Sequence, residues 1–287
     1  MGAVLHVGCP MWAHRPWVGR FLPSGTAAGT ELGPYSRLLN AVEGNTTFYA
    51  LPTPATVAKW SDLAEPGFRF VFKVPRHITH DLRLRGIGAD LAAFCDLISP
   101  LADRVGALTF QLPASFAPVD LGVLDAVLRT LSSEWRWSVE LRHPAFFVGS
   151  GRVAADRVLL RYGIERVLLD SRPLFARPPL TDAGREAYSA KPRVPALTDA
   201  LTDEPIVRFI GSDHADVTAD GLQQWQPIVA SWLVDGLCPT FFVHTPDNND
   251  GPALARAFHA EMALLVPDLE PLPEAPVIEP GEQGSLF

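Results

Sequence analysis

The stretch Phe68–Val74 reads Phe-Arg-Phe-Val-Phe-Lys-Val and opens with an aromatic ring at every second position. Because successive side chains of a strand point to opposite faces, this alternation predicts a β-strand with one strongly apolar face. Segments with helical spacing lie on both sides of it. Thr53–Ala64 begins with a threonine suited to cap a helix, and Asp90–Leu101 carries an apolar stripe at helical intervals. A helix, a strand and a second helix in this order are typical of parallel α/β proteins.

The same unit recurs along the chain. Apolar segments with β character follow one another at the interval of a strand plus a returning helix, and there are eight of them. They are Leu5–Cys9, Ala41–Phe48, Phe68–Val74, Val105–Leu112, Arg136–His143, Val167–Ser171, Ile206–Gly211 and Thr240–Thr245. Further helical patterns cover Leu121–Leu131, Leu222–Leu237 and Ala253–Val266. This α/β rhythm predicts a single closed (β/α)8 TIM-type barrel. An open doubly wound sheet is the alternative, although Gly-x-Gly-x-x-Gly and the P-loop pattern are both absent from the sequence.

Two regions depart from this rhythm. Arg172–Thr202 is rich in proline and predicts a long loop after strand six, over the face where barrels place their active sites. We expect the barrel to span residues 1–266. Residues 267–287 are rich in proline and glutamate and predict a disordered or loosely attached tail.

Composition restricts the function classes. The net charge of −8 argues against charge-driven nucleic-acid binding, so tight binding to a duplex is not expected. No apolar run reaches the roughly 20 residues that a membrane span needs, and the first residues do not resemble a signal peptide. Cys9, Cys95 and Cys238 are far apart, which argues against a disulfide framework and a cysteine zinc site. These features predict a cytoplasmic protein without a membrane partner.

One parity of each strand points into a barrel, and here that parity selects polar residues near the strand ends. The residues selected are Glu43, Asn45, Lys73, Thr109, Gln111, Ser138, Glu140, Arg142, Asp170, Arg208 and His244. In one interpretation they bind a small anionic, phosphorylated or polyhydroxyl ligand, with Glu140, Lys73 and Glu43 as catalytic candidates. Glu140 would be the acid or base, because burial can raise the pKa of a carboxyl group. In the other interpretation these charges form an ion-pair network that plugs the barrel mouth.

The histidines offer weaker indications. His77 and His80 follow strand three and His143 follows strand five, so His77 is a further candidate for ligand contact. A metal site would need several histidines together with carboxylates, and no local spacing such as His-Glu-x-x-His is present. We therefore predict no metal ligands and no cofactor, while a divalent metal stays an alternative. A Schiff base on Lys73 is another alternative, and Cys9 fits a small buried residue better than a nucleophile.

Aromatic residues gather after strand one. Trp12, Trp17, Phe21 and Tyr49 are candidates for an aromatic wall at the mouth that stacks on a sugar or a base. The alternative is that they pack beneath the loop and hold it in place.

Several segments resemble the DUF72 (YecE-like) family. They are Val7–Cys9, Val42–Tyr49, Phe70–His80, Leu108–Pro113, Val139–Pro144, Val207–Gly211 and Asp247–Asn249, and the likeness runs from about Leu5 to Val266. The resemblance implies a TIM barrel and no established reaction. The family's motif residues match Glu43, Asn45, Thr47, Lys73, Gln111, Glu140, Arg142 and Arg208. Phe242–Asp247 departs from the family, where many members have a Tyr/Phe-Asn-Asn run, so no role for His244 or Asn248 is implied.

The sequence ends Gln-Gly-Ser-Leu-Phe at residues 283–287. This resembles the bacterial sliding-clamp-binding pentapeptide, in which a Leu-Phe pair fills an apolar pocket. Gln283, Leu286 and Phe287 are therefore candidate partner-binding residues at the end of a solvated tail.

Three hypotheses follow for the function. The first is an enzyme acting on a small polar or phosphorylated ligand, with hydrolase, lyase and isomerase chemistry all open. The second is a DNA-maintenance accessory protein recruited to the sliding clamp by its tail. The third is a ligand-binding module without turnover.

Overall fold

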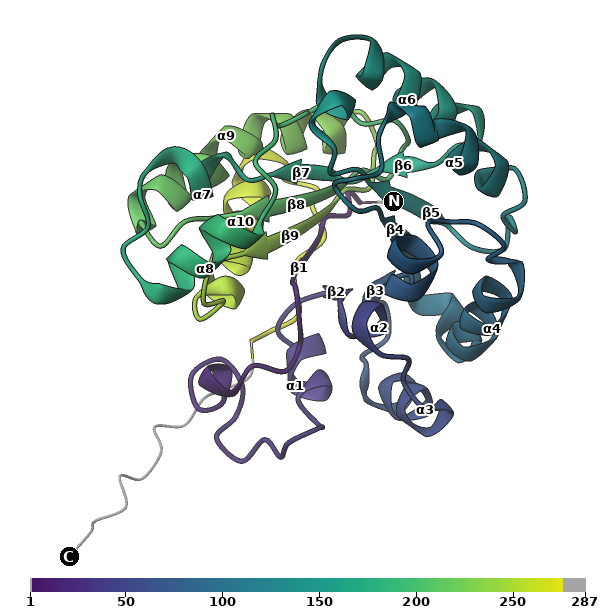
Figure 1. Ribbon diagram of the computed structural model, residues 1–287. Helices are drawn as coiled ribbons and strands as arrows, with labels where there is room; N and C mark the ends of the chain where they lie inside the picture. Colours follow the sequence, from purple (N-terminus) through teal and green to yellow (C-terminus); the bar gives the residue numbers. More distant parts are fainter. Residues whose placement is uncertain (1, 276–287) are drawn as a thin grey trace, which may run out of the picture.

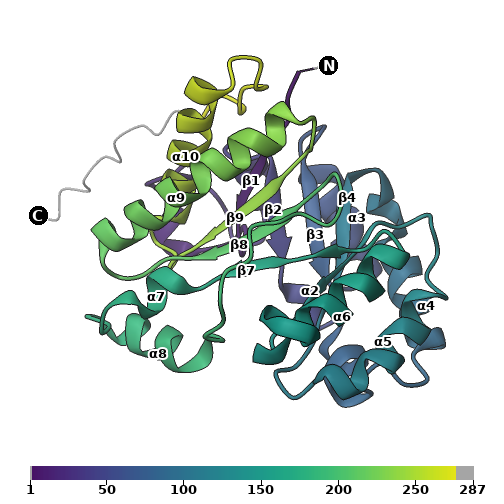
Figure 2. The same ribbon diagram turned by 90° about the horizontal axis from the view of Figure 1, so that it is seen from above.

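The computed structural model describes residues 2–275 as a barrel of parallel strands surrounded by helices (Figures 1 and 2). The strands are β1 (His6–Cys9), β2 (Ala41–Gly44), β3 (Arg69–Lys73), β4 (Val105–Gln111), β5 (Trp137–Glu140), β6 (Glu165–Arg166), β7 (Leu168–Asp170), β8 (Ile206–Ile210) and β9 (Thr240–His244). β1 pairs with both β2 and β9, while β6 pairs with β5 and β7 pairs with β8. Only Val167 separates β6 from β7, so the sheet continues around the ring through residues 165–170. The predicted TIM-type barrel is confirmed, with its sixth strand divided in two.

Helices connect the strands and cover the outside of the barrel. They are α1 (Leu32–Ser36), α2 (Thr46–Tyr49), α3 (Pro54–Leu63), α4 (Gly88–Ile98), α5 (Leu121–Leu128), α6 (Gly149–Arg161), α7 (Arg172–Ala176), α8 (Asp182–Ala190), α9 (Ala215–Val234) and α10 (Gly251–Leu265). Thr53 caps α3 as expected, because its side chain accepts a hydrogen bond from the amide of Thr56. The predicted long loop after strand six carries two of these helices, α7 and α8. Figure 2 shows α9 and α10 on one side of the barrel and α4, α5 and α6 on the other.

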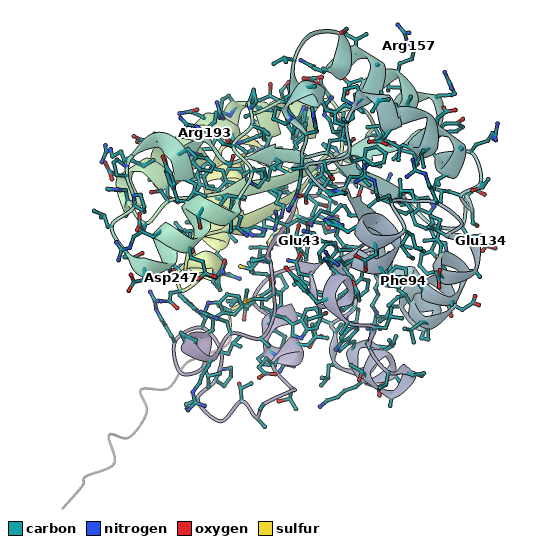
Figure 3. All side chains as sticks on the ribbon, viewed as in Figure 1. Glu43, Phe94, Glu134, Arg157, Arg193 and Asp247 are labelled. Carbon is teal, nitrogen blue, oxygen red and sulfur yellow. The ribbon has the colours of Figure 1, made fainter. Side chains whose placement is uncertain are left out.

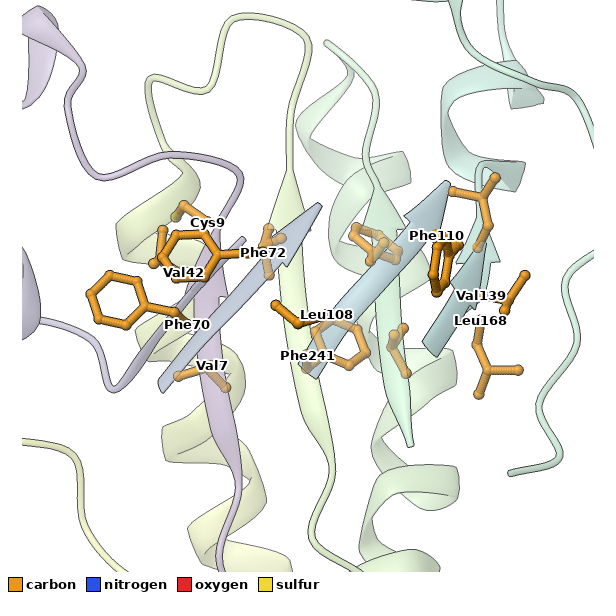
Figure 4. Packing of buried hydrophobic residues seen from close by; sticks show 14 of the residues in the cluster. Val7, Cys9, Val42, Phe70, Phe72, Leu108, Phe110, Val139, Leu168 and Phe241 are labelled. Atoms are coloured by element: carbon orange, nitrogen blue, oxygen red, sulfur yellow. The ribbon is translucent and has the colours of Figure 1, made fainter. Parts of the chain in front are cut away.

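The barrel has an apolar outer face and a layered interior. Outward side chains such as Phe70, Phe72 and Phe110 pack beneath the helices (Figure 4). A separate apolar layer fills the lower interior and consists of Ala41, Val71, Ala107, Val167, Ile206 and Phe242. On five of these strands the residue two positions later is polar, and it therefore points inward one layer nearer the C-terminal strand ends. These residues are Glu43, Lys73, Thr109, Arg208 and His244.

Gly8 is required where β1 lies against β2. A Cβ atom at Gly8 would lie 2.1 Å from the carbonyl oxygen of Ala41, whereas a Cβ at Gly106 of β4 would have its nearest neighbour at 3.6 Å. We expect Gly8→Ala to lower the free energy of unfolding by about 3 kcal/mol or more, because two paired backbones must separate. Gly106→Ala is the matched control and should change it by less than about 1 kcal/mol. Denaturant unfolding measures both, and equal effects would contradict this account of strand packing.

The chain after α10 is attached to the N-terminal end of the barrel. The amide of Ala3 donates to Asp268 and the amide of Glu270 donates to Ala3, while Leu269 is buried. Arg256 of α10 donates to the carbonyl of Pro273 at 3.1 Å. The packed part of the chain therefore extends beyond the boundary expected at residue 266. Within residues 2–275, none of the helices combines the length and the apolar character needed to cross a bilayer.

Candidate functional site

Six buried polar side chains meet inside the barrel at the C-terminal strand ends. We call them the mouth cluster: Glu43, Lys73, Gln111, Glu140, Arg208 and His244, each at most 5% exposed. They come from β2, β3, β4, β5, β8 and β9, so strands far apart in the sequence supply one site. Figure 3 shows Glu43 near the centre of the ring of strands, while Glu134 and Arg157 lie at the periphery.

Glu43 is the carboxylate with the most partners. Its Oε1 lies 2.9 Å from Nε of Arg208 and 3.6 Å from Nζ of Lys73. Its Oε2 lies 3.1 Å from Nε2 of His244, and it also accepts a 2.8 Å hydrogen bond from the amide of Asn45. Asn45 was expected to point inward from a longer strand, but β2 ends at Gly44. The Asn45 amide still reaches the cluster, because the chain turns there into α2.

Glu140 forms the second centre of the cluster. Its Oε1 accepts a 2.7 Å hydrogen bond from Nε of Arg142 and lies 3.7 Å from Nη1 of Arg208. Its Oε2 lies 3.5 Å from Nζ of Lys73, which also donates to the side chain of Gln111. Lys73 therefore lies between the two carboxylates. Arg142 is beyond the end of β5 and its side chain is 20% exposed, which places it at the edge of the cluster toward solvent.

The charges set the protonation states. Burial alone would raise the pKa of both glutamates, but the surrounding cations hold each pKa below its usual range. The cations are Arg208 and Lys73 around Glu43. Around Glu140 they are Arg142, Lys73 and Arg208. The expected raised pKa of Glu140 is therefore wrong, and Glu140 stays ionised at neutral pH. Burial, followed by repulsion from Arg208, lowers the pKa of Lys73 to about 8 against the attraction of the two carboxylates. Lys73 is thus the cluster residue that titrates nearest neutral pH.

Sequence reasoning missed Lys191, which follows α8 in the segment after strand six. Burial lowers the pKa of Lys191 to about 8, and the charges of Arg208 and Arg142 act in the same direction. The charges of Glu43 and Glu140 act in the opposite direction, so Lys191 lies within electrostatic range of the mouth cluster. The available signal was composition: among 24 basic residues the sequence has only three lysines, Lys59, Lys73 and Lys191.

Several buried atoms of the cluster lack a hydrogen bond. Within residues 2–275, Glu140 Oε2, Arg208 Nη1 and His244 Nε2 have no hydrogen-bond partner. His244 Nε2 is close to Glu43 but is not aligned for a hydrogen bond. A buried polar atom without a partner usually costs about 1–3 kcal/mol, so a bound group that supplied the missing partners here would remove that cost.

Two of the predicted ligand contacts, His77 and Asp170, lie away from the mouth cluster. His77 is exposed after β3, with its Nδ1 3.7 Å from Asp81. Asp170 faces the helices instead of the interior, where its carboxylate accepts 2.8 Å hydrogen bonds from Trp225 of α9 and from Arg172. The pairing of β7 with β8 explains why Asp170 points outward. Leu169 is in register with the inward Arg208, whereas Asp170 is in register with Phe209, the next residue of β8.

The predicted aromatic wall is largely a packed layer. Trp12 lies edge-on to Trp60 and Phe70, and Phe70 belongs to the outer face of β3. Trp17 is fully buried and stacks on Tyr35. Of the four candidates, Tyr49 alone is strongly exposed, at 79%. The alternative of packing beneath the loop therefore holds for Trp12 and Trp17.

Cysteine and metal chemistry receive no support from the geometry. Cys9 is buried, and burial raises the pKa of its thiol far above the usual range, which disfavours a nucleophilic thiolate. Across residues 2–275, histidine, cysteine, aspartate and glutamate nowhere gather in a group of three or more that could hold a metal ion.

The sequence matches the model of the family described as "Protein of unknown function DUF72" over residues 6–277. The chain belongs to the DUF72 family. Among curated relatives, the UPF0759 protein YecE of Escherichia coli K12 is 37% identical over 285 residues, covering 99% of this chain and 100% of the relative. The protein of the same name from Escherichia coli O157:H7 is 36% identical over the same length. The resemblance predicted from the motifs is confirmed.

Solved structures of DUF72 proteins share the fold. A crystal structure from Enterococcus faecalis V583 has a TM-score of 0.66 at 16% identity, covering 92% of this chain and 96% of that one. One from Thermotoga maritima MSB8 has a TM-score of 0.63 at 20% identity, covering 91% and 99%. At these identities the likeness supports the barrel fold and carries no further information on the site.

His244 makes the DUF72 chain sensitive to acid. Burial, together with the Arg208 charge, lowers the pKa of His244 from 6.5 to about 3. Between these values the unfolded chain binds a proton that the folded protein excludes, so the free energy of unfolding falls as the pH decreases. We expect His244→Gln to reduce this slope by up to about 1.4 kcal/mol per pH unit. Urea unfolding between pH 6.5 and 4 measures the slope, and an unchanged slope would contradict the buried neutral state of His244.

Proposed function

We propose that the mouth cluster binds a small anionic ligand, such as a phosphorylated compound, and that the protein transfers a proton to or from it. The observation that carries the proposal is the imbalance of charge. Two buried carboxylates, Glu43 and Glu140, face four cationic side chains: Lys73, Arg142, Lys191 and Arg208. Lys73 and Arg208 alone would balance the two carboxylates in a network that only plugged the barrel, so the partly exposed Arg142 and Lys191 are cations in excess of what such a plug needs.

The unpaired guanidinium nitrogen supports the same proposal. Arg208 Nη1 is buried and has no acceptor within hydrogen-bond distance among the described residues. Arg142 lies at the edge of the cluster with part of its side chain open to solvent. An oxygen of a phosphate or carboxylate near both would supply the missing acceptor and offset the excess positive charge.

The choice of lysine supports proton transfer. The chain uses arginine for nearly all its cations, yet two of its three lysines face the mouth cluster. Arginine stays protonated in proteins, whereas a buried lysine loses its proton readily. With a pKa of about 8, Lys73 can donate a proton in its charged form and accept one in its neutral form. Glu43 and Glu140 then hold the cations in place, and the role expected for Glu140 passes to Lys73.

Calorimetric titration of the full chain with inorganic phosphate tests the binding step. We expect saturable binding that Arg142→Gln weakens at least roughly tenfold, since charge-assisted hydrogen bonds contribute about 1.5–3 kcal/mol. Arg157→Gln is the matched control, because Arg157 is exposed on α6 away from the mouth. Absence of binding by the wild-type protein, or equal affinity in the Arg142 variant, would overturn the proposal.

The end of the chain favours a second candidate function. We propose that Gln283, Leu286 and Phe287, which lie outside the described residues, bind the bacterial sliding clamp. The attachment of residues 268–270 beside Ala3 supports this, because the tail then starts at the N-terminal end of the barrel, opposite the mouth cluster. A peptide of residues 278–287 should bind the clamp, and the full chain without Leu286 and Phe287 should not. Equal clamp binding by the truncated and complete chains would contradict recruitment by the tail.

A further inference from the structure

An exposed aromatic side chain stands beside the mouth cluster without a structural reason. Tyr49 ends α2, the short helix that starts directly after β2 and the cluster residue Glu43. Its ring is 79% exposed and touches the fold through an edge contact with Phe48, at 5.1 Å between ring centroids. A tyrosine so exposed contributes little to stability, and its ring is free to contact a ligand.

The surroundings of Tyr49 place it at the rim of the mouth. Phe48 is buried between Tyr49 and His80, and its ring centroid lies 5.2 Å from that of His80. His80 in turn lies near Arg142 and Glu140, whose charges act on its imidazole. The rim is thus an aromatic row of Tyr49, Phe48 and His80 beside the cationic side of the cluster.

We infer that the anionic ligand carries a ring, and that this ring packs on Tyr49 while the anionic group lies at Arg208 and Arg142. The inference rests on the proposed function and names the class of its ligand: a sugar phosphate or a nucleotide. Tyrosine suits this role, because its face accepts the flat side of a base or the C–H face of a sugar and its hydroxyl remains solvated. Trp12 and Trp17 are packed and Phe21 is partly buried, so Tyr49 is the most open of these four aromatic candidates.

The test compares three probes on the full chain: inorganic phosphate, ribose 5-phosphate and AMP. The measured quantity is the ratio of each ring-bearing affinity to the phosphate affinity within the same variant. We expect a ratio of roughly ten in the wild-type protein, in line with typical stacking contributions. Tyr49→Leu should bring the ratio close to one, whereas Tyr49→Phe should keep it. If ribose 5-phosphate already binds more tightly than phosphate, the sugar is the ring that packs on Tyr49. If only AMP binds more tightly than phosphate, the base is that ring.

Two results would overturn the inference and leave the proposed function standing. They are phosphate binding without any gain from either ring, and a gain that Tyr49→Leu retains. If the wild-type protein binds none of the three probes, the proposed function itself is overturned. Tyr49→Leu is expected to fold normally, because exposed substitutions usually change the free energy of unfolding by less than about 0.5 kcal/mol.

Discussion

Replacing Glu140 with glutamine is expected to lower the free energy of unfolding by about 3–5 kcal/mol. Glu140 is fully buried, and Arg142, Lys73 and Arg208 lie 2.7, 3.5 and 3.7 Å from its oxygens. Glutamine keeps the shape of the side chain but removes the negative charge. The three cations then repel one another with only Glu43 to compensate them.

Denaturant unfolding at pH 7 measures this effect. Glu134→Gln is the matched control, because this substitution removes the same charge from an exposed position. It should change the free energy of unfolding by no more than about 0.5 kcal/mol. A loss of less than about 1 kcal/mol in the Glu140 variant would show that the cations do not depend on this carboxylate. The account of the mouth cluster as one electrostatic unit would then be wrong.

Anion binding is expected to weaken at least roughly tenfold between pH 7 and pH 9.5. Lys73 and Lys191 each have a pKa of about 8, so both lose their charge across this interval. Sulfate is the suitable probe, because its own charge is constant there. The arginines keep their charge, so the remaining affinity at high pH reports their share of the binding.

Lysine variants separate the two contributions. Lys191→Gln should retain the part of the pH dependence that comes from Lys73, and Lys73→Met should retain the part from Lys191. Lys59→Gln is the control, because Lys59 is exposed on α3 and should leave the whole pH dependence in place. An affinity for sulfate that stays constant up to pH 9.5 would contradict the involvement of either lysine.

The sequence predicted most of the mouth cluster because strands have a period of two. Where apolar and polar residues alternate, as in Trp137–Arg142, one apolar residue fixes the direction of its neighbours. This rule found Glu43, Lys73, Glu140 and Arg208, and it failed for Asp170. Val167–Leu169 is apolar throughout, so its alternation does not show which residue faces inward, and only the pairing with β8 settles the direction.

Loops have no such period, which explains the remaining differences. Trp12 and His77 follow strands directly and were expected at the mouth, but contacts with Trp60 and Asp81 place them elsewhere. Lys191 lies in the long segment after strand six, directly after α8. Its position depends on tertiary packing, and in the sequence only the rarity of lysine distinguished it.

The side-chain amine of Lys73 offers the most direct test of the central claim. Nuclear magnetic resonance of the isotopically labelled full chain can follow its titration, because only three lysines contribute signals and Lys73→Met assigns one of them. We expect Lys73 to titrate near pH 8 in the free protein, and we expect saturating phosphate to move this titration to higher pH. A titration that starts near the ordinary lysine value, about 10.4, or that phosphate leaves unmoved, would contradict an anion site built around this lysine.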